Sequence, residues 1–186
     1  TQYGFTFIPS VLVGVSLAGF IAWLASFPLL KLKEDSFVLV SFGFAIIMYN
    51  IMLNWATLTK GPLGIKGILA PQILGVSFFQ KPLFLALALA VLAATYFLLK
   101  KIVSSPYGTV MKGIRENEIV SGVNGHNVLS YQRSVFVVGA FFAAVAGSLM
   151  ATYLAFIEPK LFELMPSVFL LVMVIIGGMG NLKGSV

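Results

Sequence analysis

Cysteine is absent from this chain of 186 residues, and histidine occurs once, as His126. Without cysteine the chain forms no disulfide bonds and no thiolate metal site, and it has no cysteine nucleophile. A single histidine excludes an HExxH zinc site, and we expect His126 to be a solvated loop residue rather than a member of a catalytic triad. The chain also lacks a Gly-x-x-x-x-Gly-Lys-Ser/Thr sequence, so it does not bind ATP through a P-loop. These absences predict a protein that is not an enzyme and that has no metal site or cofactor.

Charged residues are also scarce. They make up 10% of the chain against 59% hydrophobic residues, and the mean hydropathy is +1.01. A soluble domain keeps about a quarter of its residues charged, so these charges are too few to cover a globule. The net charge of +6 comes from basic residues scattered between apolar runs, which argues against nucleic acid and fits a membrane with anionic lipid. The composition predicts an all-α integral membrane protein.

Long apolar runs show where the chain crosses the membrane. A spanning helix needs about 20 apolar residues, and four runs meet this need, at residues 9–30, 36–58, 82–99 and 134–157. A fifth run, residues 165–179, has 15 residues and would be about 22 Å long as a helix, against a hydrocarbon core of about 30 Å. It ends in a glycine-rich stretch, so we predict a half-spanning or broken helix there.

The loops between the spans differ in basic residues. Residues 31–35 and 100–133 share one side of the membrane, and residues 59–81 and 158–164 share the other. The first side carries Lys31, Lys33, Lys100, Lys101, Lys112, Arg115 and Arg133; the second carries Lys60, Lys66, Lys81 and Lys160. Because cytoplasmic loops are enriched in lysine and arginine, we predict that the 100–133 loop is cytoplasmic.

Small residues recur every four positions in two of the spans. The first set is Gly14, Ala18, Ala22 and Ser26, and the second is Gly139, Ala143, Gly147, Ala151 and Ala155. Small residues at this spacing let helix backbones approach closely in lipid. The pattern predicts either packing within the chain or contact with a second membrane subunit.

The second span carries a polar stripe. Gly43, Asn50, Asn54 and Thr57 fall within an arc of about 60° on a helix. Asparagine facing lipid is unfavourable, so the stripe forms either an interhelical hydrogen-bond seam or, through Asn50, Asn54 and Thr57, the lining of a solute path. No ionisable residue lies inside a predicted span, whereas devices driven by protons or voltage usually contain one. We therefore expect the energy source to lie outside this chain.

The 100–133 loop contains a short helix of its own. Pro106 prevents the third span from continuing, and residues 109–121 have a helical pattern. Gly122 and Gly125 end this helix because glycine accepts left-handed backbone geometry, and Asn127 is a cap for the fourth span. Two functions fit such a helix: a structural element at the membrane surface, or a docking element for a cytosolic partner.

Three motifs occur along the chain in a recognisable order. The first is Leu58-Thr59-Lys60-Gly61-Pro62-Leu63-Gly64-Ile65; the second is Ser105-Pro106-Tyr107-Gly108 with Gly113-Ile114-Arg115-Glu116-Asn117-Glu118-Ile119 and Gly125; the third is Pro159-Lys160-Leu161-Phe162 followed by Gly177-Gly178-Met179-Gly180-Asn181-Leu182-Lys183-Gly184. Together with the spans between them, they resemble the LivM-type permeases, the membrane subunits of branched-chain amino acid ABC importers. The resemblance covers roughly residues 30–186.

This resemblance implies a multi-pass permease subunit of the cell (inner, cytoplasmic) membrane that imports branched-chain amino acids or a related small polar solute. It also implies a LivH-type second permease subunit, cytosolic ATPase subunits that hydrolyse the ATP, and an extracytoplasmic solute-binding protein as partners. The loop helix would be the coupling helix. In it, Arg115, Glu116 and Glu118 would contact a groove on the ATPase, and Gly125 would permit the turn out of that groove.

An alternative is a secondary transporter or channel subunit that is not driven by ATP. Such a protein would need ionisable residues within its spans or an inverted repeat, and the sequence shows neither. In either case we expect residues 1–186 to be a single transmembrane domain and a fragment of a longer chain.

Overall fold

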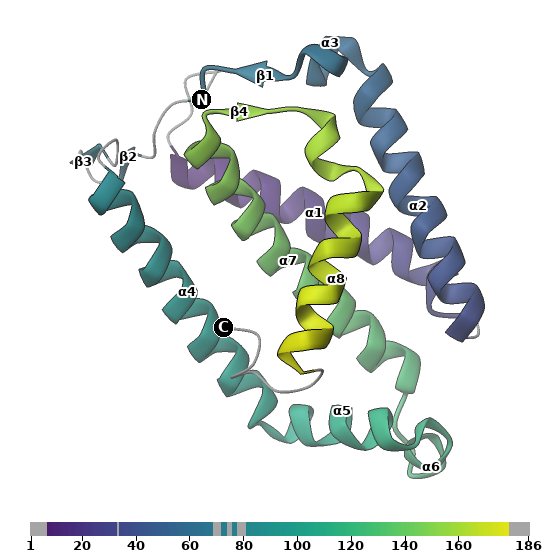
Figure 1. Ribbon diagram of the computed structural model, residues 1–186. Helices are drawn as coiled ribbons and strands as arrows, with labels where there is room; N and C mark the ends of the chain where they lie inside the picture. The colour runs from purple at the N-terminus through teal and green to yellow at the C-terminus, as the bar shows by residue number, and fades with distance from the viewer. Residues whose placement is uncertain (1–6, 33, 69–71, 74–75, 78–80, 179–186) are drawn as a thin grey trace. The chain divides into compact units, whose positions relative to one another are not determined.

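The computed structural model describes residues 7–32, 34–68, 72–73, 76–77 and 81–178, and most of these are helical (Figure 1). Among the described residues, four helices are long and apolar enough to cross a membrane: α1 (Phe7–Leu29), α2 (Glu34–Asn54), α4 (Lys81–Val103) and α7 (Val128–Leu154). A continuous helix satisfies its own backbone hydrogen bonds, which lipid cannot do. The predicted all-α membrane fold with four spanning helices is confirmed.

Some helix ends differ from their predicted positions. The prediction that the second span reaches residue 58 is wrong, because α2 ends at Asn54 and residues Ala56–Thr59 form a separate turn, α3. The fourth span also begins earlier than predicted, since α7 takes in the polar residues 128–133. The third span, α4, continues to Val103 and holds Lys100 and Lys101 in its last turn, where the helix dipole favours positive charge.

The short C-terminal helix agrees with its prediction. Helix α8 (Leu164–Gly177) has 14 residues, which is about 21 Å and less than the hydrocarbon core requires. Gly178 follows it with φ 95°, a backbone conformation that favours glycine. The predicted end at residue 179 lies outside the described residues.

The chain divides into two compact units, each made of two separate stretches of sequence. The first unit comprises Thr1–Leu32 and Ala70–Met150, and the second comprises Lys33–Leu69 and Ala151–Val186. The first unit contains α1, the strands β2 (Gln72–Ile73) and β3 (Val76–Ser77), which pair with each other, α4, α5 (Pro106–Glu116), α6 (Glu118–Val123) and most of α7.

Within the first unit, α1 buries one face. Ala22, Ala25, Ser26 and Leu29 are each at most 7% exposed, and the Ser26 hydroxyl donates to the Trp23 carbonyl oxygen at 2.6 Å. One helical turn earlier, a side chain at Gly19 would overlap the ring of Phe141 on α7. The predicted packing role of small residues therefore holds for this end of α1.

The small residues of α7 behave differently. Gly139 and Ala143 are exposed, and a Cβ added at Gly139 or Gly147 would meet no atom within 4 Å. Phe141, which meets α1, lies on another face of the helix. Contact of the α7 stripe with a second membrane subunit stays a prediction.

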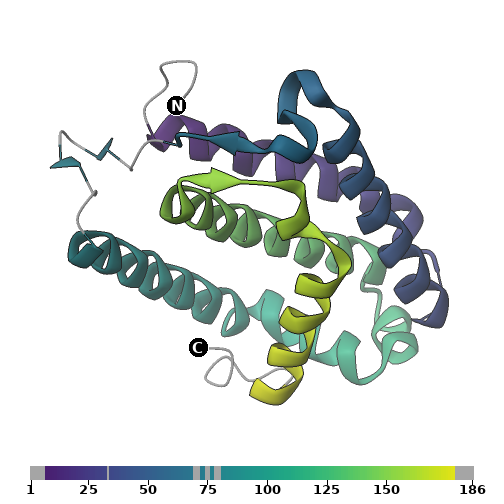
Figure 2. The same cartoon turned by 45° about the horizontal axis from the view of Figure 1, so that its top comes forward.

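The second unit is organised around the C-terminal half of α2. Its other elements are α3, η1 (Gly61–Leu63), β1 (Ile65–Lys66), β4 (Phe156–Ile157), η2 (Pro159–Phe162) and α8. Strands β1 and β4 pair antiparallel, with Ile65 opposite Ile157 and Lys66 opposite Phe156, and both views show them side by side (Figures 1 and 2). Helix α2 contacts η1, η2 and α8. The pairing joins the two loops that the charge pattern places on the extracytoplasmic side.

The motif at residues 58–65 folds as a tight turn against α2. The Thr59 hydroxyl lies 2.5 Å from the Met52 carbonyl oxygen and 2.8 Å from that of Trp55, so it can donate to either. Lys60 has left-handed geometry, with φ 59° and ψ 14°, and Gly61 follows with φ 54°. A Cβ at Gly61 would come within 2.8 Å of the Leu53 carbonyl oxygen. The glycine is needed because the turn passes directly over the end of α2.

Ala155 provides a test of backbone strain in the second unit. It has φ 52°, and its carbonyl oxygen accepts from the backbone N–H groups of Gly67 and Ile68 at 3.2 and 3.3 Å. Left-handed geometry costs a residue other than glycine about 1–2 kcal/mol, so Ala155→Gly should stabilise the protein by about 0.5–1 kcal/mol after the added flexibility of the unfolded chain is subtracted. The thermal unfolding midpoint in detergent should rise by about 1–3 °C.

The matched control is Ala151→Gly, in the last helical turns of α7. There glycine should lower stability by about 1 kcal/mol, because the backbone is already helical. If the two variants lower the midpoint equally, the strain assigned to Ala155 is wrong.

Candidate functional site

The loop between α4 and α7 forms two helices instead of the single predicted helix over 109–121. Helix α5 begins at Pro106, where Ser105 is the N-cap and its hydroxyl accepts from the Gly108 N–H at 3.4 Å. The chain then leaves helical geometry at Asn117 (φ −155°, ψ 105°) and forms α6. Asn117 caps the new helix, since its side-chain oxygen accepts from the Val120 N–H at 3.0 Å.

The corner between α4 and α5 is closely packed. Gly108 is buried, and a Cβ there would overlap the Val103 carbonyl oxygen and lie 2.7 Å from that of Ile102. The Ser104 hydroxyl donates to the Lys100 carbonyl oxygen at 2.7 Å. These are backbone atoms that cannot move without opening the corner, so α4 fixes the direction in which α5 leaves it.

The residues predicted to dock a partner lie on both short helices. Arg115 and Glu116 are at the end of α5, and Glu118 starts α6, all three with exposed side chains. Ile114 on α5 is 6% exposed, so the opposite face of that helix packs inward. The prediction placed these three charged residues on one helix, whereas the break at Asn117 puts Glu118 on a second one. All three still lie within four consecutive positions of the sequence and are exposed.

Apolar side chains on α6 were not anticipated. Ile119 is 80% exposed, Val120 is 54% exposed and Val123 is 83% exposed. Such exposure on a solvated loop is unusual for three neighbouring β-branched residues, and it gives the segment an apolar surface beside Glu116 and Glu118. The sequence offered a signal, because Ile119, Val120 and Val123 follow Asn117 at helical spacing.

The end of the loop agrees in part with its prediction. Gly125 has φ 85° and permits the turn after α6, and the Asn127 side-chain oxygen accepts from the Ser130 N–H at 3.2 Å, which caps α7. Gly122, in contrast, does not end the helix: α6 continues to Val123.

An aromatic cluster, formed by Tyr107, Tyr131 and His126, holds α5 against the start of α7. The rings of Tyr107 and Tyr131 stack with centroids 5.0 Å apart, and the Tyr107 hydroxyl donates to the Tyr131 carbonyl oxygen at 3.3 Å. His126 lies edge-on to Tyr131 at 5.9 Å and is half-buried, so the prediction that it is a solvated residue is wrong. Two residues further along α7, the Arg133 guanidinium lies 4.0 Å from the centroid of the Phe27 ring on α1.

The polar stripe of the second span is only partly preserved. Thr57 belongs to α3, beyond the break at Trp55, so it does not share a helix face with Asn50 and Asn54 as predicted. The Asn50 side chain donates to the Ile46 carbonyl oxygen and the Asn54 side chain to that of Asn50, each at 2.8 Å. Each amide therefore uses one of its two N–H groups within its own helix.

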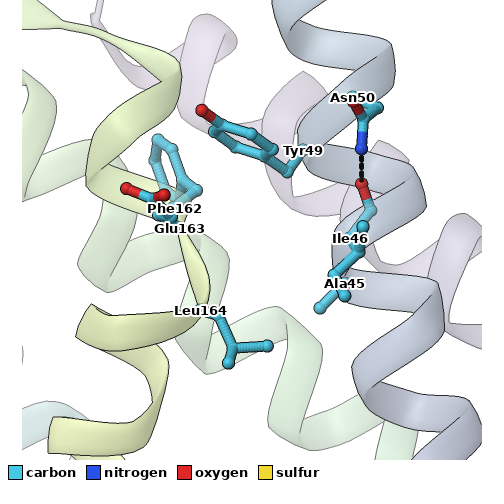
Figure 3. Close-up of a pocket in the computed structure, with 7 residues that line it drawn as sticks. All are labelled: Ala45, Ile46, Tyr49, Asn50, Phe162, Glu163 and Leu164. Atoms are coloured by element: carbon cyan, nitrogen blue, oxygen red, sulfur yellow. Dashed lines mark hydrogen bonds between the residues drawn. The ribbon is translucent and has the colours of Figure 1, made fainter.

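Asn50 also lines a pocket in the second unit. The pocket has a volume of about 220 Å³ and lies between α2 and the start of α8 (Figure 3). Its lining consists of Ala45, Ile46, Tyr49, Asn50, Phe162, Glu163 and Leu164. Asn54 and Thr57 are not among the lining residues. The sequence alone does not indicate Glu163 as a site residue, because its position near α2 depends on the fold of the 158–164 loop.

Comparison with known proteins agrees with the resemblance. The model of the family described as "Branched-chain amino acid transport system / permease component" matches residues 1–186. The chain is similar to the high-affinity branched-chain amino acid transport system permease protein LivM of Escherichia coli (strain K12). The two are 28% identical over an alignment of 202 residues, which covers 96% of this chain and 48% of the relative.

Two further relatives carry similar names. The LivM permease of Salmonella typhimurium is 29% identical over 192 residues, 89% of this chain and 45% of the relative. A probable LivM permease of Methanocaldococcus jannaschii is 27% identical over 165 residues, 84% of this chain and 46% of the relative. The chain spans about half the length of the curated relatives it matches. No solved structure matches it.

Proposed function

Since the chain belongs to the family of permease components of branched-chain amino acid transport systems, we propose that it is the transmembrane subunit of an ATP-driven importer. Its solute would be a branched-chain amino acid or a related small polar solute. The family match along residues 1–186 is the observation that carries this proposal, and the four spanning helices place the chain in the cell membrane as a multi-pass protein. The transport subunit would not hydrolyse ATP.

The proposal includes three kinds of partner. Separate cytosolic subunits would hydrolyse ATP, a LivH-type second permease subunit would complete the membrane part, and an extracytoplasmic protein would bind the solute. The absence of a P-loop and of ionisable residues in the predicted spans fits an energy source outside the chain.

The exposed surface of α5 and α6 is our candidate for docking the ATPase. Its centre is apolar, formed by Ile119 and Val123, and Glu116 and Glu118 lie at its edge. Interfaces commonly have an apolar centre and a polar rim, and charge at the rim sets orientation and association rate. The complementary partner would present an apolar cleft with basic residues opposite Glu116 and Glu118 and an acidic or carbonyl acceptor opposite Arg115. In this arrangement Arg115 contacts the rim, and Gly125 returns the chain to α7.

Helix α5 is attached to two of the spanning helices, α4 and α7. Its start is fixed to α4 by the corner at Gly108, and Tyr107 stacks on Tyr131 of α7. A displacement of α5 by the ATPase would therefore move both α4 and α7. This is rigid-body gating, in which ATP binding favours one of two arrangements.

A binding experiment tests the docking surface. Reversal of two charges, Glu116→Lys with Glu118→Lys, should reduce the affinity for the ATPase subunits by about tenfold, because two rim contacts of about 0.5–1 kcal/mol each sum to about 1.4 kcal/mol. ATPase retained on membranes that contain the assembled protein is the measured quantity. Ile119→Ser with Val123→Ser should weaken retention by about thirtyfold, since about 1 kcal/mol of apolar burial is lost per side chain.

The matched control reverses two exposed charges in the second unit, Lys66→Glu with Lys160→Glu, and should leave ATPase retention unchanged. Equal retention by all variants would mean that α5 and α6 do not dock the ATPase. Uptake that persists in ATP-depleted vesicles and follows an ion gradient would support a secondary transporter instead.

A further inference from the structure

The pocket in the second unit combines one apolar wall with several hydrogen-bond acceptors. Ala45, Ile46, Tyr49 and Asn50 come from adjacent turns of α2, so they share one face of that helix. Phe162, Glu163 and Leu164 form the opposite wall where η2 ends and α8 begins. Figure 3 shows the Tyr49 ring extending from α2 toward Phe162 and Glu163. The pocket volume of about 220 Å³ is far above the ~10–15 Å³ of such space that a single water molecule needs. The pocket therefore suits a small solute.

Each of the three polar side chains at the pocket has an oxygen that can accept a hydrogen bond. Glu163 contributes a carboxylate, and this side chain makes no capping hydrogen bond to the start of α8. The Asn50 amide nitrogen uses one of its two N–H groups to donate to the Ile46 carbonyl oxygen at 2.8 Å, and the amide oxygen can accept. The Tyr49 hydroxyl can also accept. A primary ammonium group has donors only, three of them, and carries the charge that a carboxylate attracts.

The position of the pocket fits entry from outside the cell. Tyr49 and Asn50 are five and four residues before the last residue of α2, Asn54, which is about 6–8 Å along the helix axis. Beyond Asn54 the chain enters the turn that the lysine and arginine distribution assigns to the extracytoplasmic side. Near this boundary a carboxylate is much less costly than at the bilayer centre. A solute released outside would meet the pocket before the middle of the membrane.

We propose that this pocket is an entry site for a zwitterionic amino acid, in which Glu163, Tyr49 and Asn50 hold the α-ammonium group. The aliphatic side chain of the solute packs against Ile46, Phe162 and Leu164. The proposal rests on the proposed import function and adds a binding site in the chain itself, separate from the solute-binding protein.

Equilibrium binding of radiolabelled leucine to the whole membrane complex, without the solute-binding protein, tests the site. Glu163→Gln keeps the shape of the side chain and removes its charge, so it should weaken leucine binding by at least about tenfold. Tyr49→Phe should weaken it by about threefold or more, because it removes one neutral hydrogen-bond partner. The control Glu158→Gln makes the same change on the preceding segment, outside the pocket, and should leave the dissociation constant unchanged.

Two leucine analogues identify the group that is recognised. Isopentylamine has the ammonium without the carboxylate and should displace leucine from the unmodified complex but about tenfold less well from Glu163→Gln. 4-Methylpentanoate has only the carboxylate and should not displace leucine from either. Displacement by 4-methylpentanoate, or unchanged leucine binding by Glu163→Gln, would overturn the proposal.

Uptake in the same vesicles distinguishes the two proposals. If ATP-driven leucine uptake is intact but the unmodified complex binds no leucine at millimolar concentration, the entry site is wrong and the import function stands. If ATP drives no uptake in the presence of all partners, the import function fails and the entry site with it.

Discussion

Replacing Gly64 with alanine is expected to destabilise the second unit by more than about 3 kcal/mol. Gly64 has φ 63° and ψ 176°, a region of backbone geometry that is almost restricted to glycine and costs other residues about 1–3 kcal/mol. The added methyl would also overlap the carbonyl oxygen of Ile157 and come within 2.9 Å of the Phe156 ring. Because the nearest atom belongs to paired backbone in β4, it cannot rotate away, and overpacking adds about 1–3 kcal/mol.

The thermal unfolding midpoint in detergent measures this effect and should fall by about 6–12 °C. Gly67→Ala is the matched control, since Gly67 also has positive φ, at 75°, but a Cβ there would meet no atom within 4 Å. That variant should lower the free energy of unfolding only by the backbone strain, about 1–2 kcal/mol. Equal losses in the two variants would show that the contact between Gly64 and β4 contributes nothing.

The second large effect is expected at Gly108, where α4 meets α5. Gly108→Ala places a methyl group against the Val103 carbonyl, 2.6 Å from its carbon, and against the Ile102 oxygen. The corner must open, and α5 must turn away from Tyr131. Because the proposed docking surface lies at the far end of α5 and on α6, we expect ATP-driven uptake to fall at least about tenfold while the spanning helices still fold. A tenfold fall corresponds to about 1.4 kcal/mol of lost coupling free energy.

Uptake per assembled complex is the quantity to compare. Gly113→Ala changes the same helix, and its Cβ would make only an ordinary contact, 3.6 Å from the Ser121 hydroxyl oxygen. Alanine favours helix over glycine by about 1 kcal/mol, so this control should keep or increase uptake. If Gly108→Ala retains normal uptake, the corner does not determine where α5 docks.

The spanning helices could be predicted because lipid imposes a simple requirement on the chain. Twenty apolar residues in succession have almost no alternative to a transmembrane helix. The error at the end of α2 has a different origin. Trp55, Ala56 and Leu58 are as apolar as the residues before them, and the break there is stabilised by the Thr59 hydroxyl and by the passage of Gly61 over the Leu53 carbonyl oxygen. Hydropathy contains no term for such contacts.

The break between α5 and α6 shows that a local signal can be outweighed. Asparagine followed by glutamate is a good helix start, and Asn117 with Glu118 forms one. The helical pattern on both sides of this pair predicts one continuous helix, in which Asn117 would be an interior residue rather than a cap. The pocket, in contrast, had no local signal. Tyr49 and Glu163 are more than a hundred positions apart, and only the fold of the second unit brings them to one site.

The pairing of β1 with β4 has a consequence for the order in which the chain is completed during synthesis. Ile65 and its partner Ile157 are separated by 157 − 65 = 92 positions. At about 5–20 residues per second, a ribosome needs roughly 5–18 s to extend the chain from one to the other. During this interval the N–H and C=O groups of β1 have no partner strand, whereas α4, α5, α6 and α7 follow one another directly. The part of the first unit from α4 to α7 can therefore assemble from neighbouring segments, while the second unit, with its pocket, waits for the arrival of residues 156–164.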